Sequence, residues 1–399
     1  MKIAILTSGI LPIPAVKGGA VENLIDFYLD YNRRQRLHDI TVYSVSDSLT
    51  ALHPAYQASI SDVDSPNHYH YVEIWSLWSK IRKRLYKWTH GKERFHYTIE
   101  YFMEEALKDI TKQDYDLIIL ENRPAYSLKL ACCTNAKIVH HLHNDFLHKD
   151  IPDAQTIYDQ AWRILTVSDY IGRRVKTIDP LSTKCFTVNN GIDKTAFSQS
   201  NTQGPTRTEL GLQPSDFVLV FSGRVNAEKG ITELIQAMTL LKDHPNIKLL
   251  VMGSSFFGDS HTDDPFITRL KEQAAQLGNR IVFTGFIPYS RIPGYLRLAD
   301  VAVIPSMWDD PFPTSVLEAM CMGMPIITTL RGGIPEEVTP ECALLLTTDS
   351  EIVNNLQDAI LNLHDHEEKR HMMGQQALRL SSRFDKDRFA ADFFHALTD

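Results

Sequence analysis

The chain has 399 residues, of which 43% are hydrophobic and 23% charged, a composition typical of a globular protein large enough for two domains. Its formal net charge of -8 argues against a general nucleic-acid-binding protein, and no nucleic-acid partner is expected. Five cysteines at scattered positions form neither a zinc motif nor a disulfide framework, and they fit a reducing, cytoplasmic setting.

The chain begins on an apolar segment, residues 3–7, which predicts a central parallel strand and is too short for a signal peptide. No apolar run is long enough to span a membrane. A glycine pair, Gly18 and Gly19, precedes a predicted helix over residues 21–32. Glycines at this place let the backbone approach a phosphate at the helix start, and a simple turn explains the pair equally well.

Residues 80–94 are the most basic segment of this acidic chain, and aromatic residues are interleaved with the charges. A basic helix of this kind can lie on an anionic membrane surface, which predicts a peripheral membrane contact. A solvated surface helix whose aromatic residues pack inward is the alternative. Residues 40–45 predict another strand, whereas the irregular pattern of residues 46–67 predicts mainly loops.

Two further strands are predicted at residues 116–121 and 137–143, and the second ends on histidines. Alternation of side chains along a strand places His141 and His143 on one face and His140 on the other. Polar residues at the carboxyl end of a parallel strand lie where doubly wound sheets bind ligands. A structural histidine explains them equally well, and no metal site is expected because no other ligand cluster is visible.

In the second half, an apolar strand at residues 217–221 leads into Arg224, and Lys229 follows five positions later. Two cations in a loop after a parallel strand suit a diphosphate, because arginine offers a fork of donors and lysine a point charge. Cations are mildly unfavourable at a helix start, which favours binding over a plain surface role. Polar residues 198–208 predict a linker between the halves.

The segment at residues 308–337 carries the densest set of binding signals. Asp310 follows a predicted buried strand, and a proline-rich loop leads to a helix that Thr314 or Ser315 is expected to cap. Glu318 lies in the first turns of that helix, where a capping-box partner is its alternative role. The free N–H groups of the helix start attract phosphate, and the two carboxylates can accept hydrogen bonds from sugar hydroxyls.

Several of these positions resemble the signature of the family 4 retaining glycosyltransferases. The matching positions are Arg224, Lys229, Asp310, Glu318, Gly332, Gly333 and Glu336. The chain departs from that family in carrying Asp310 where glutamate is usual, so the side chain is shorter by one methylene and keeps its charge. The resemblance extends over nearly the whole chain and is weakest at residues 46–100.

The resemblance implies an α/β fold of the GT-B type, with two doubly wound, Rossmann-like domains facing each other across a cleft. An acceptor-binding domain is expected at residues 1–197 and a domain that binds the nucleotide-sugar donor at residues 206–380. A C-terminal helix within residues 381–399 is expected to pack back on the first domain. The alternation of predicted strands and helices through both halves agrees with this architecture.

The resemblance also implies a role for each candidate residue. The residues with expected catalytic roles are Arg224, Lys229, Asp310 and His143. The residues expected to bind the donor are Gly18, Gly19, Glu318, Phe286, Ile287, Thr314 and Ser315, and Asp145 is expected on the acceptor side. In this arrangement Arg224 and Lys229 hold the leaving diphosphate, Glu318 the ribose and Asp310 the transferred sugar. Fixed cations can replace a divalent metal, so neither a metal nor another cofactor is expected.

The expected activity is therefore the retaining transfer of a hexose-type sugar from a UDP-sugar to a hydroxyl of a growing glycan. A lipid-linked acceptor and a place at the inner face of the membrane, in cell-surface polysaccharide synthesis, follow from the resemblance and the basic segment. Two alternatives stay open. A nucleotide-sugar 2-epimerase shares this fold and needs no acceptor, and a non-catalytic partner subunit would keep only the donor site.

Overall fold

The computed structural model describes residues 1–46, 49–62, 64–74, 81, 97–198, 204–254 and 265–398. Except for Ile81, the segment predicted to contact a membrane, residues 80–94, lies outside the described residues. None of the described helices has the length and apolar character needed to cross a membrane. The chain divides into two compact units: unit 1 comprises Met1–Asn189 and Phe389–Asp399, and unit 2 comprises Asn190–Arg388.

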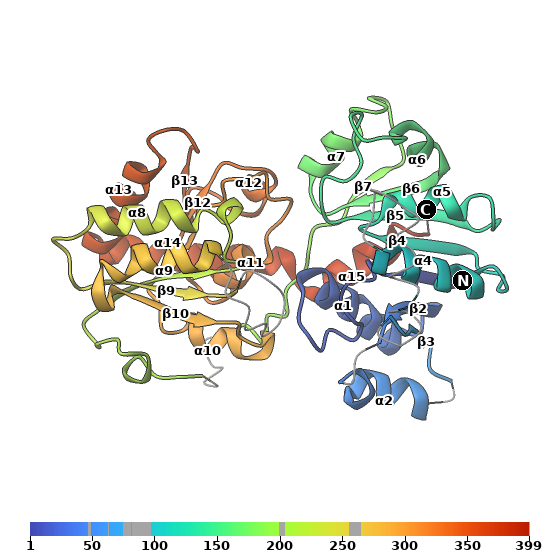
Figure 1. The fold of residues 1–399 in the computed structure, drawn as a ribbon, viewed down its shortest axis with the longest axis horizontal. Coiled ribbons are helices and arrows are strands. Elements are labelled where there is room, and N and C mark those ends of the chain that lie inside the picture. The colour runs from blue at the N-terminus through green and yellow to red at the C-terminus, as the bar shows by residue number, and fades with distance from the viewer. Residues whose placement is uncertain are drawn as a thin grey trace. The chain divides into compact units, whose positions relative to one another are not determined.

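Unit 1 is built on a seven-stranded parallel sheet with the order β3-β2-β1-β4-β5-β6-β7 (Figure 1). Its strands are β1 (Lys2–Leu6), β2 (Asp39–Val45), β3 (Asn67–Val72), β4 (Leu117–Glu121), β5 (Lys137–Leu142), β6 (Ala161–Thr166) and β7 (Cys185–Thr187). Its helices are α1 (Ala20–Gln35), α2 (Pro54–Ser61), α4 (Tyr97–Ile110), α5 (Ser127–Leu130), α6 (Ala154–Gln160), α7 (Asp169–Val175) and the end of α15 (Lys386–His395).

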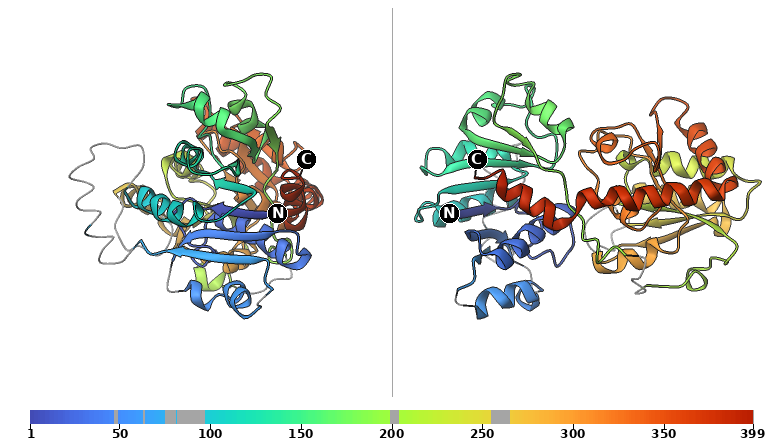
Figure 2. Two further views of the ribbon diagram at one scale, coloured as in Figure 1. Left: turned by 90° about the vertical axis from the view of Figure 1, so that its right-hand side faces the viewer. Right: turned by 180° about the vertical axis from the view of Figure 1, so that it is seen from behind.

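Helices cover both faces of the unit 1 sheet (Figure 2). Alternate residues of β1 point to opposite faces, so Ile3 and Ile5 pack in a core with α1 and α15, while Leu6 packs in a core with α4. Phe389 and Phe393 of α15 belong to the first of these cores. Burial on both faces explains why the strands read as uninterrupted apolar segments.

Unit 2 is built on a six-stranded parallel sheet with the order β10-β9-β8-β11-β12-β13. Its strands are β8 (Phe217–Ser222), β9 (Ile247–Met252), β10 (Ile281–Gly285), β11 (Val301–Ile304), β12 (Ile326–Thr329) and β13 (Ala343–Leu346). Its helices are α8 (Ile231–Leu240), α9 (Pro265–Ala275), α10 (Ile292–Leu296), α11 (Thr314–Cys321), α12 (Ile334–Glu337), α13 (Ile352–Asp365) and α14 (Glu367–Leu380). Leu219 and Phe221 of β8 pack in one core with residues of α8 and α13.

These sheets confirm the prediction of two doubly wound α/β domains. In each sheet the chain first runs toward one edge and then continues on the other side of its first strand. The strand order therefore reverses between β1 and β4 in unit 1 and between β8 and β11 in unit 2. Ligands of such sheets bind at the carboxyl ends of the strands near this reversal, so the two positions are where sites are expected.

The prediction of mainly loops for residues 46–67 is wrong. Helix α2 occupies Pro54–Ser61, and β3 begins at Asn67. Pro54 fits the first helical position, and the ring of His53 accepts a hydrogen bond from the N–H of Ala55 at 3.2 Å. The N-cap of this short helix is His53 instead of one of the usual capping residues, so residue preferences do not predict where the helix begins.

Candidate functional site

A lysine–aspartate pair lies at the strand-order reversal of the unit 2 sheet. Lys229 follows β8 and Asp310 follows β11, and their side chains form an ion pair. Only 17% of the Lys229 side chain and 6% of the Asp310 side chain are exposed. The ammonium of Lys229 also lies 5.5 Å from the centre of the Trp308 ring, which is within range of a cation–π contact. The pair thus places a partly buried cation beside a buried carboxylate where a ligand is expected.

The backbone around this pair is held in place by glycines and a cap. Lys229 ends the 3₁₀ turn η4 (Ala227–Lys229), and the Asn226 side chain accepts a hydrogen bond from its N–H at 3.2 Å. Gly332 has a φ of 58°, and a Cβ there would lie 2.2 Å from the carbonyl oxygen of Asp310. The N–H of Gly333 donates to that same carbonyl at 2.8 Å. Glycine is therefore needed at position 332 for the Asp310 loop to approach.

Arg224 pairs with Glu228 instead of Asp310. Its guanidinium lies 3.9 Å from the carboxylate of Glu228, and 41% of its side chain is exposed. An exposed contact of this length contributes little stability. Arg224 therefore keeps most of its donors available, on the same loop after β8 that carries Lys229.

The N-terminus of α11 lies close in sequence to Asp310, but the predicted cap is wrong. Pro313 is the N-cap residue, and no side chain caps the helix. The helix begins one residue earlier than a Thr314 cap would allow, since the backbone of Pro313 already has the extended conformation of an N-cap. Thr314 and Ser315 are instead the first two helical residues, whose N–H groups have no acceptor within the helix.

Glu318 is a buried carboxyl to which none of the described residues donates a hydrogen bond. It is the fifth residue of α11 and therefore not a capping-box partner, which removes the structural explanation considered for it. Its exposed fraction is 5%, and no residue in the described ranges donates a hydrogen bond to its carboxyl group. Burial raises the pKa of Glu318 to about 8, so the carboxyl is largely protonated at neutral pH in the ligand-free chain.

A second buried carboxyl, Glu337, was not singled out by the sequence. Both of its carboxylate oxygens are buried and lack a hydrogen-bond partner in the part of the chain that the structure describes. Burial, followed by the charges of Asp310 and Glu336, raises its pKa well above the usual value. Two adjacent glutamates ordinarily indicate a solvated turn, so no pattern in the sequence marked this position.

Phe286 and Ile287 follow β10 at one edge of the unit 2 sheet, whereas Lys229 and Asp310 follow the central strands β8 and β11. Ile287 is buried and Phe286 is half-buried. Their expected place near the nucleotide base stays a prediction.

The glycine pair of unit 1 supports a close backbone turn before α1. Gly18 has a φ of 72° and Gly19 a φ of 107°, and both values favour glycine. A Cβ at Gly19 would lie 2.1 Å from the carboxylate of Glu22 in the first turn of α1. Burial raises the pKa of Glu22 to about 7. This carboxyl occupies the space beside the helix start, so binding of a diphosphate by Gly18 and Gly19 stays a prediction.

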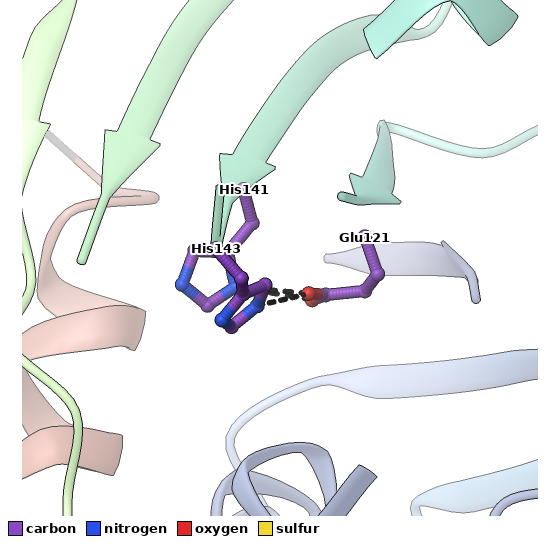
Figure 3. A group of neighbouring side chains, drawn as sticks. All are labelled: Glu121, His141 and His143. Atoms are coloured by element: carbon purple, nitrogen blue, oxygen red, sulfur yellow. Dashed lines mark hydrogen bonds and ion pairs between the residues drawn. The ribbon is translucent and has the colours of Figure 1, made fainter. Parts of the chain in front are cut away.

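Figure 3 shows a second polar cluster, in which His141, His143 and Glu121 converge at the ends of β5 and β4. His141 is the register partner of Glu121 on the neighbouring strand. His143 Nε2 lies 2.9 Å from one Glu121 oxygen, and His141 Nδ1 lies 3.1 Å from the same oxygen. The rings of His141 and His143 are 4.2 Å apart, while His140 contacts the carbonyl of Ile157, which confirms the predicted alternation.

The charge state of this cluster follows from its burial and its hydrogen bonds. Burial lowers the pKa of His143 to about 4, so its imidazole is neutral at pH 7. Burial alone would raise the pKa of Glu121, but the interaction with His141 and the hydrogen bonds from His141 and His143 hold it below the usual value. The cluster is therefore an ionised carboxylate that accepts hydrogen bonds from imidazole N–H groups.

The same three residues are of the types that bind transition metals, but the surrounding shell does not suit a metal. A metal-bound histidine almost always donates its second ring N–H to a carboxylate, carbonyl or water. The second ring nitrogens, His141 Nε2 and His143 Nδ1, are buried and have no partner among the described residues. The hydrogen-bonded network therefore explains the donor set better than a metal centre does.

Asp145, expected on the acceptor side, is paired with Arg174 of α7 at 2.7 Å. A quarter of the Asp145 side chain is exposed. This ion pair engages only Oδ2, and Oδ1 is buried without a hydrogen-bond partner among the described residues. The acceptor role of Asp145 stays a prediction.

Comparisons with known proteins identify the family of the chain. A model of the family described as "Glycosyl transferases group 1" matches residues 203–379. Spore coat protein SA of Bacillus subtilis (strain 168) is 29% identical over 392 residues, which cover 95% of this chain and 94% of that protein. A putative glycosyltransferase of the same organism, YtcC, is 30% identical over 353 residues, which cover 86% of this chain and 78% of that protein.

Solved structures of the same fold cover the whole chain. The crystal structure of Anabaena HepE in complex with UDP and glucose has a TM-score of 0.71 and 20% sequence identity, with 100% of both chains covered. This likeness, together with the two parallel sheets, confirms the predicted GT-B fold.

Proposed function

The chain belongs to the group 1 glycosyl transferases, and on this premise we propose that it is a retaining, metal-independent hexosyltransferase. It moves a sugar from a UDP-sugar to a hydroxyl of a growing, lipid-linked glycan. The observation that carries this proposal is the buried Lys229–Asp310 pair at the strand-order reversal of unit 2. Support for the donor class comes from HepE, whose structure was solved with UDP and glucose.

Donor binding exchanges the partners of this ion pair. The diphosphate carries more negative charge than Asp310, so it attracts the ammonium of Lys229 away from the carboxylate. Arg224, which the structure leaves half-exposed, adds a planar fork of donors to the phosphate oxygens. Asp310 is then free to accept hydrogen bonds from hydroxyls of the transferred sugar. The negative charge that develops on the leaving diphosphate meets cations already in place, which lowers the barrier.

Glu318 completes the donor site through the ribose. Its carboxyl receives no hydrogen bond from the described residues, and the two ribose hydroxyls supply donors. Each new hydrogen bond favours the ionised form, so nucleotide binding lowers the raised pKa of Glu318 and releases a proton near neutral pH. The first N–H groups of α11, at Thr314 and Ser315, contribute further donors for the diphosphate.

The acceptor is proposed from the relatives and from the basic segment at residues 80–94. Spore coat protein SA bears the name of a cell-surface assembly, which supports an acceptor in cell-surface synthesis. A peripheral contact with the inner face of the membrane through residues 80–94 fits this use.

The experiment that tests the proposal follows radiolabelled UDP-sugars in the presence of a membrane-lipid extract. We expect label to move into the lipid fraction, with the anomeric configuration of the donor retained in the product. Isomerised donor without transfer indicates the epimerase instead, and binding of the nucleotide without turnover indicates a non-catalytic subunit. Protein carrying Lys229→Ala provides the background, because it keeps the chain and removes the buried cation.

A further inference from the structure

A buried glutamate of unit 2, Glu337, lies close to the lysine–aspartate pair. It is the last residue of α12, and its exposed fraction is 1%. Both of its carboxyl oxygens are buried, and neither has a hydrogen-bond partner in the described parts of the chain. Burial is the main cause of its raised pKa; the charges of Asp310 and Glu336 raise the pKa further, and that of Lys229 lowers it. Glu337 therefore faces both members of the pair without bonding to either.

The backbone that carries Glu337 is anchored on the backbone of Asp310. The N–H of Gly333 donates to the carbonyl oxygen of Asp310 at 2.8 Å, and Gly333 is also the N-cap residue of α12. This helix has only four residues, and the side chain of its first residue, Ile334, is fully buried. Glu337 lies one helical turn after Gly333. The contact that sets the Asp310 loop therefore also sets the position of the Glu337 carboxyl.

The two carboxyl groups, Asp310 and Glu337, differ in their access to the cation between them. The ammonium of Lys229 bonds to Asp310, which favours the ionised form of that carboxyl. Glu337 has no such bond, and both its burial and the nearby negative charge favour its protonated form. Two carboxyl groups this close titrate as a pair, and the first proton they hold resides on Glu337. A protonated carboxyl is a hydrogen-bond donor, which an ionised one is not.

In the proposed mechanism, the donor diphosphate takes Lys229 away from Asp310. The Asp310 side chain is only 6% exposed, and a buried charge that loses its partner is strongly destabilised. We infer that Glu337 is a positioning residue that donates its carboxyl O–H to Asp310 when Lys229 turns to the diphosphate, so that Asp310 stays ionised and in place for the sugar. The event that moves Lys229 rests on the proposed function, whereas the proton on Glu337 and its bond to an unpaired Asp310 do not.

The first test reads the proton on Glu337 in the ligand-free protein. We expect the infrared difference spectrum between wild type and Glu337→Gln at pH 7 to contain the C=O stretch of a carboxylic acid, while the bands of other carboxyls cancel. Glu341→Gln is the matched control, because Glu341 is exposed and a hydrogen bond with Thr339 holds its pKa below the usual value. Its difference spectrum should contain carboxylate bands. Carboxylate bands in the Glu337→Gln difference spectrum overturn the inference.

The second test imitates the departure of Lys229 by substitution and needs no ligand. Lys229→Met removes the charge and leaves an unbranched side chain. In the wild type, Glu337→Leu removes a buried acid without a partner, so the urea midpoint should not fall. In Lys229→Met, the same change takes the proposed donor from Asp310, so the midpoint should fall. Glu337→Gln keeps an N–H donor and should restore most of that loss. Equal shifts of the midpoint by Glu337→Leu in both backgrounds contradict the inference.

The third test connects this hydrogen bond to sugar transfer. Glu337→Leu should lower kcat about 10- to 100-fold, the effect of one lost hydrogen bond to a charged group, whereas Glu337→Gln should retain most of the activity. As the pH rises through the raised pKa of Glu337, the wild type loses the donated proton and kcat should fall. Glu337→Gln should lack this loss.

A merely structural role for Glu337 predicts a different result, in which both variants lose activity and share the pH profile of the wild type. That result would overturn the inference. If no UDP-sugar is turned over, the proposed function fails, while the infrared and unfolding measurements still decide the inference about Glu337. Circular dichroism confirms that each variant is folded.

Discussion

Two buried glutamates, one in each unit, differ in their hydrogen-bond donors and therefore in their charge. Glu121 of unit 1 receives three side-chain hydrogen bonds, and its pKa is held below the usual value. Glu318 of unit 2 has no donor in the described parts of the chain, and its pKa is about 8. Their exposed fractions are 0% and 5%. The comparison shows that donors, more than depth, decide whether a buried carboxyl is ionised.

The difference extends to the sites around the two residues. In unit 1 the chain supplies three donors to the Glu121 carboxylate. In unit 2 no described residue donates to Glu318, and Lys229 and Asp310 neutralise each other. A nucleotide should therefore change the stability and protonation of unit 2 more than those of unit 1.

The largest expected effect comes from removing the cations of unit 2. Lys229→Ala and Arg224→Ala should each lower kcat/KM about 100- to 1,000-fold, as does the loss of other groups that stabilise developing charge. Lys229→Ala should lower kcat/KM more than Arg224→Ala, because the side chain of Lys229 is less exposed than that of Arg224. Initial rates with the UDP-sugar identified in the transfer assay measure both effects.

Lys369→Ala is the matched control for these variants. Lys369 lies on α14 of the same unit, and its ammonium donates to the side chain of Asn362, outside the proposed site. Its loss should leave the rate within twofold. Near-wild-type rates in both Lys229→Ala and Arg224→Ala would remove the assignment of the diphosphate to this loop.

Glu318→Gln should have a smaller effect, on the free energy of unfolding. Whether the variant is more or less stable than the wild type depends on whether UDP is present. The pKa of Glu318 is about 8 in the folded chain, above the usual value of 4.5. As the pH rises from about 4.5 to 8, the unfolded chain loses this proton first, so the wild-type protein loses stability across that window. The ligand-free variant should therefore be more stable at pH 8 by about 1–3 kcal/mol, the cost of an unpaired buried group.

With UDP present, the wild type should be more stable than Glu318→Gln, because the amide cannot accept as many hydrogen bonds from ribose as a carboxylate. Thermal melting between pH 5 and 9, with and without UDP, measures both effects. Glu368→Gln, on the exposed surface of α14, should show neither. Equal stabilisation of wild type and Glu318→Gln by UDP would contradict the ribose assignment.

Replacing Gly332 with alanine should have a smaller effect on stability and on donor binding. Gly332→Ala must adopt a φ of 58° and place its Cβ 2.2 Å from the carbonyl of Asp310. Gly211→Ala is a matched control in the same unit, since Gly211 has a φ of 73° and nothing within 4 Å of its Cβ position. Both should lose about 1–2 kcal/mol for the left-handed backbone.

Only Gly332→Ala should also raise KM for the donor, because only there does the new methyl displace the Asp310 loop. Urea unfolding and initial rates separate the two contributions. Equal KM values in the two variants would show that the loop position does not matter for donor binding.

The fold followed from local patterns in the sequence, because strands buried on both faces are uninterrupted apolar segments between helices. The alternation of His140, His141 and His143 was predictable for the same reason, since it depends only on the period of a strand. Glu121 was not predictable as their partner. It lies 20 positions from His141, and only the adjacency of β4 and β5 brings the two together.

The errors at α11 and α2 also have a physical cause. Thr314 and Ser315 are good capping residues, but the extended backbone of Pro313 starts the helix before them. Helix α2 starts at a histidine cap that residue preferences do not indicate. The missing donors of Glu318 could not be predicted either, because the sequence does not show which polar groups reach a buried carboxyl.

Removing divalent metals should have the smallest effect on the transfer rate. The result distinguishes a metal site in unit 2 from one in unit 1. In the proposed donor site of unit 2, Arg224 and Lys229 take the place of a metal, so an excess of EDTA should leave the transfer rate within twofold. In unit 1, Glu121 already accepts three hydrogen bonds, and the second ring nitrogens of His141 and His143 have no partner among the described residues. If EDTA abolishes transfer, the metal ion that restores activity shows in which unit a metal site was overlooked. Magnesium prefers oxygen ligands and would act at the diphosphate of unit 2, whereas zinc prefers imidazole and would act at His141 and His143.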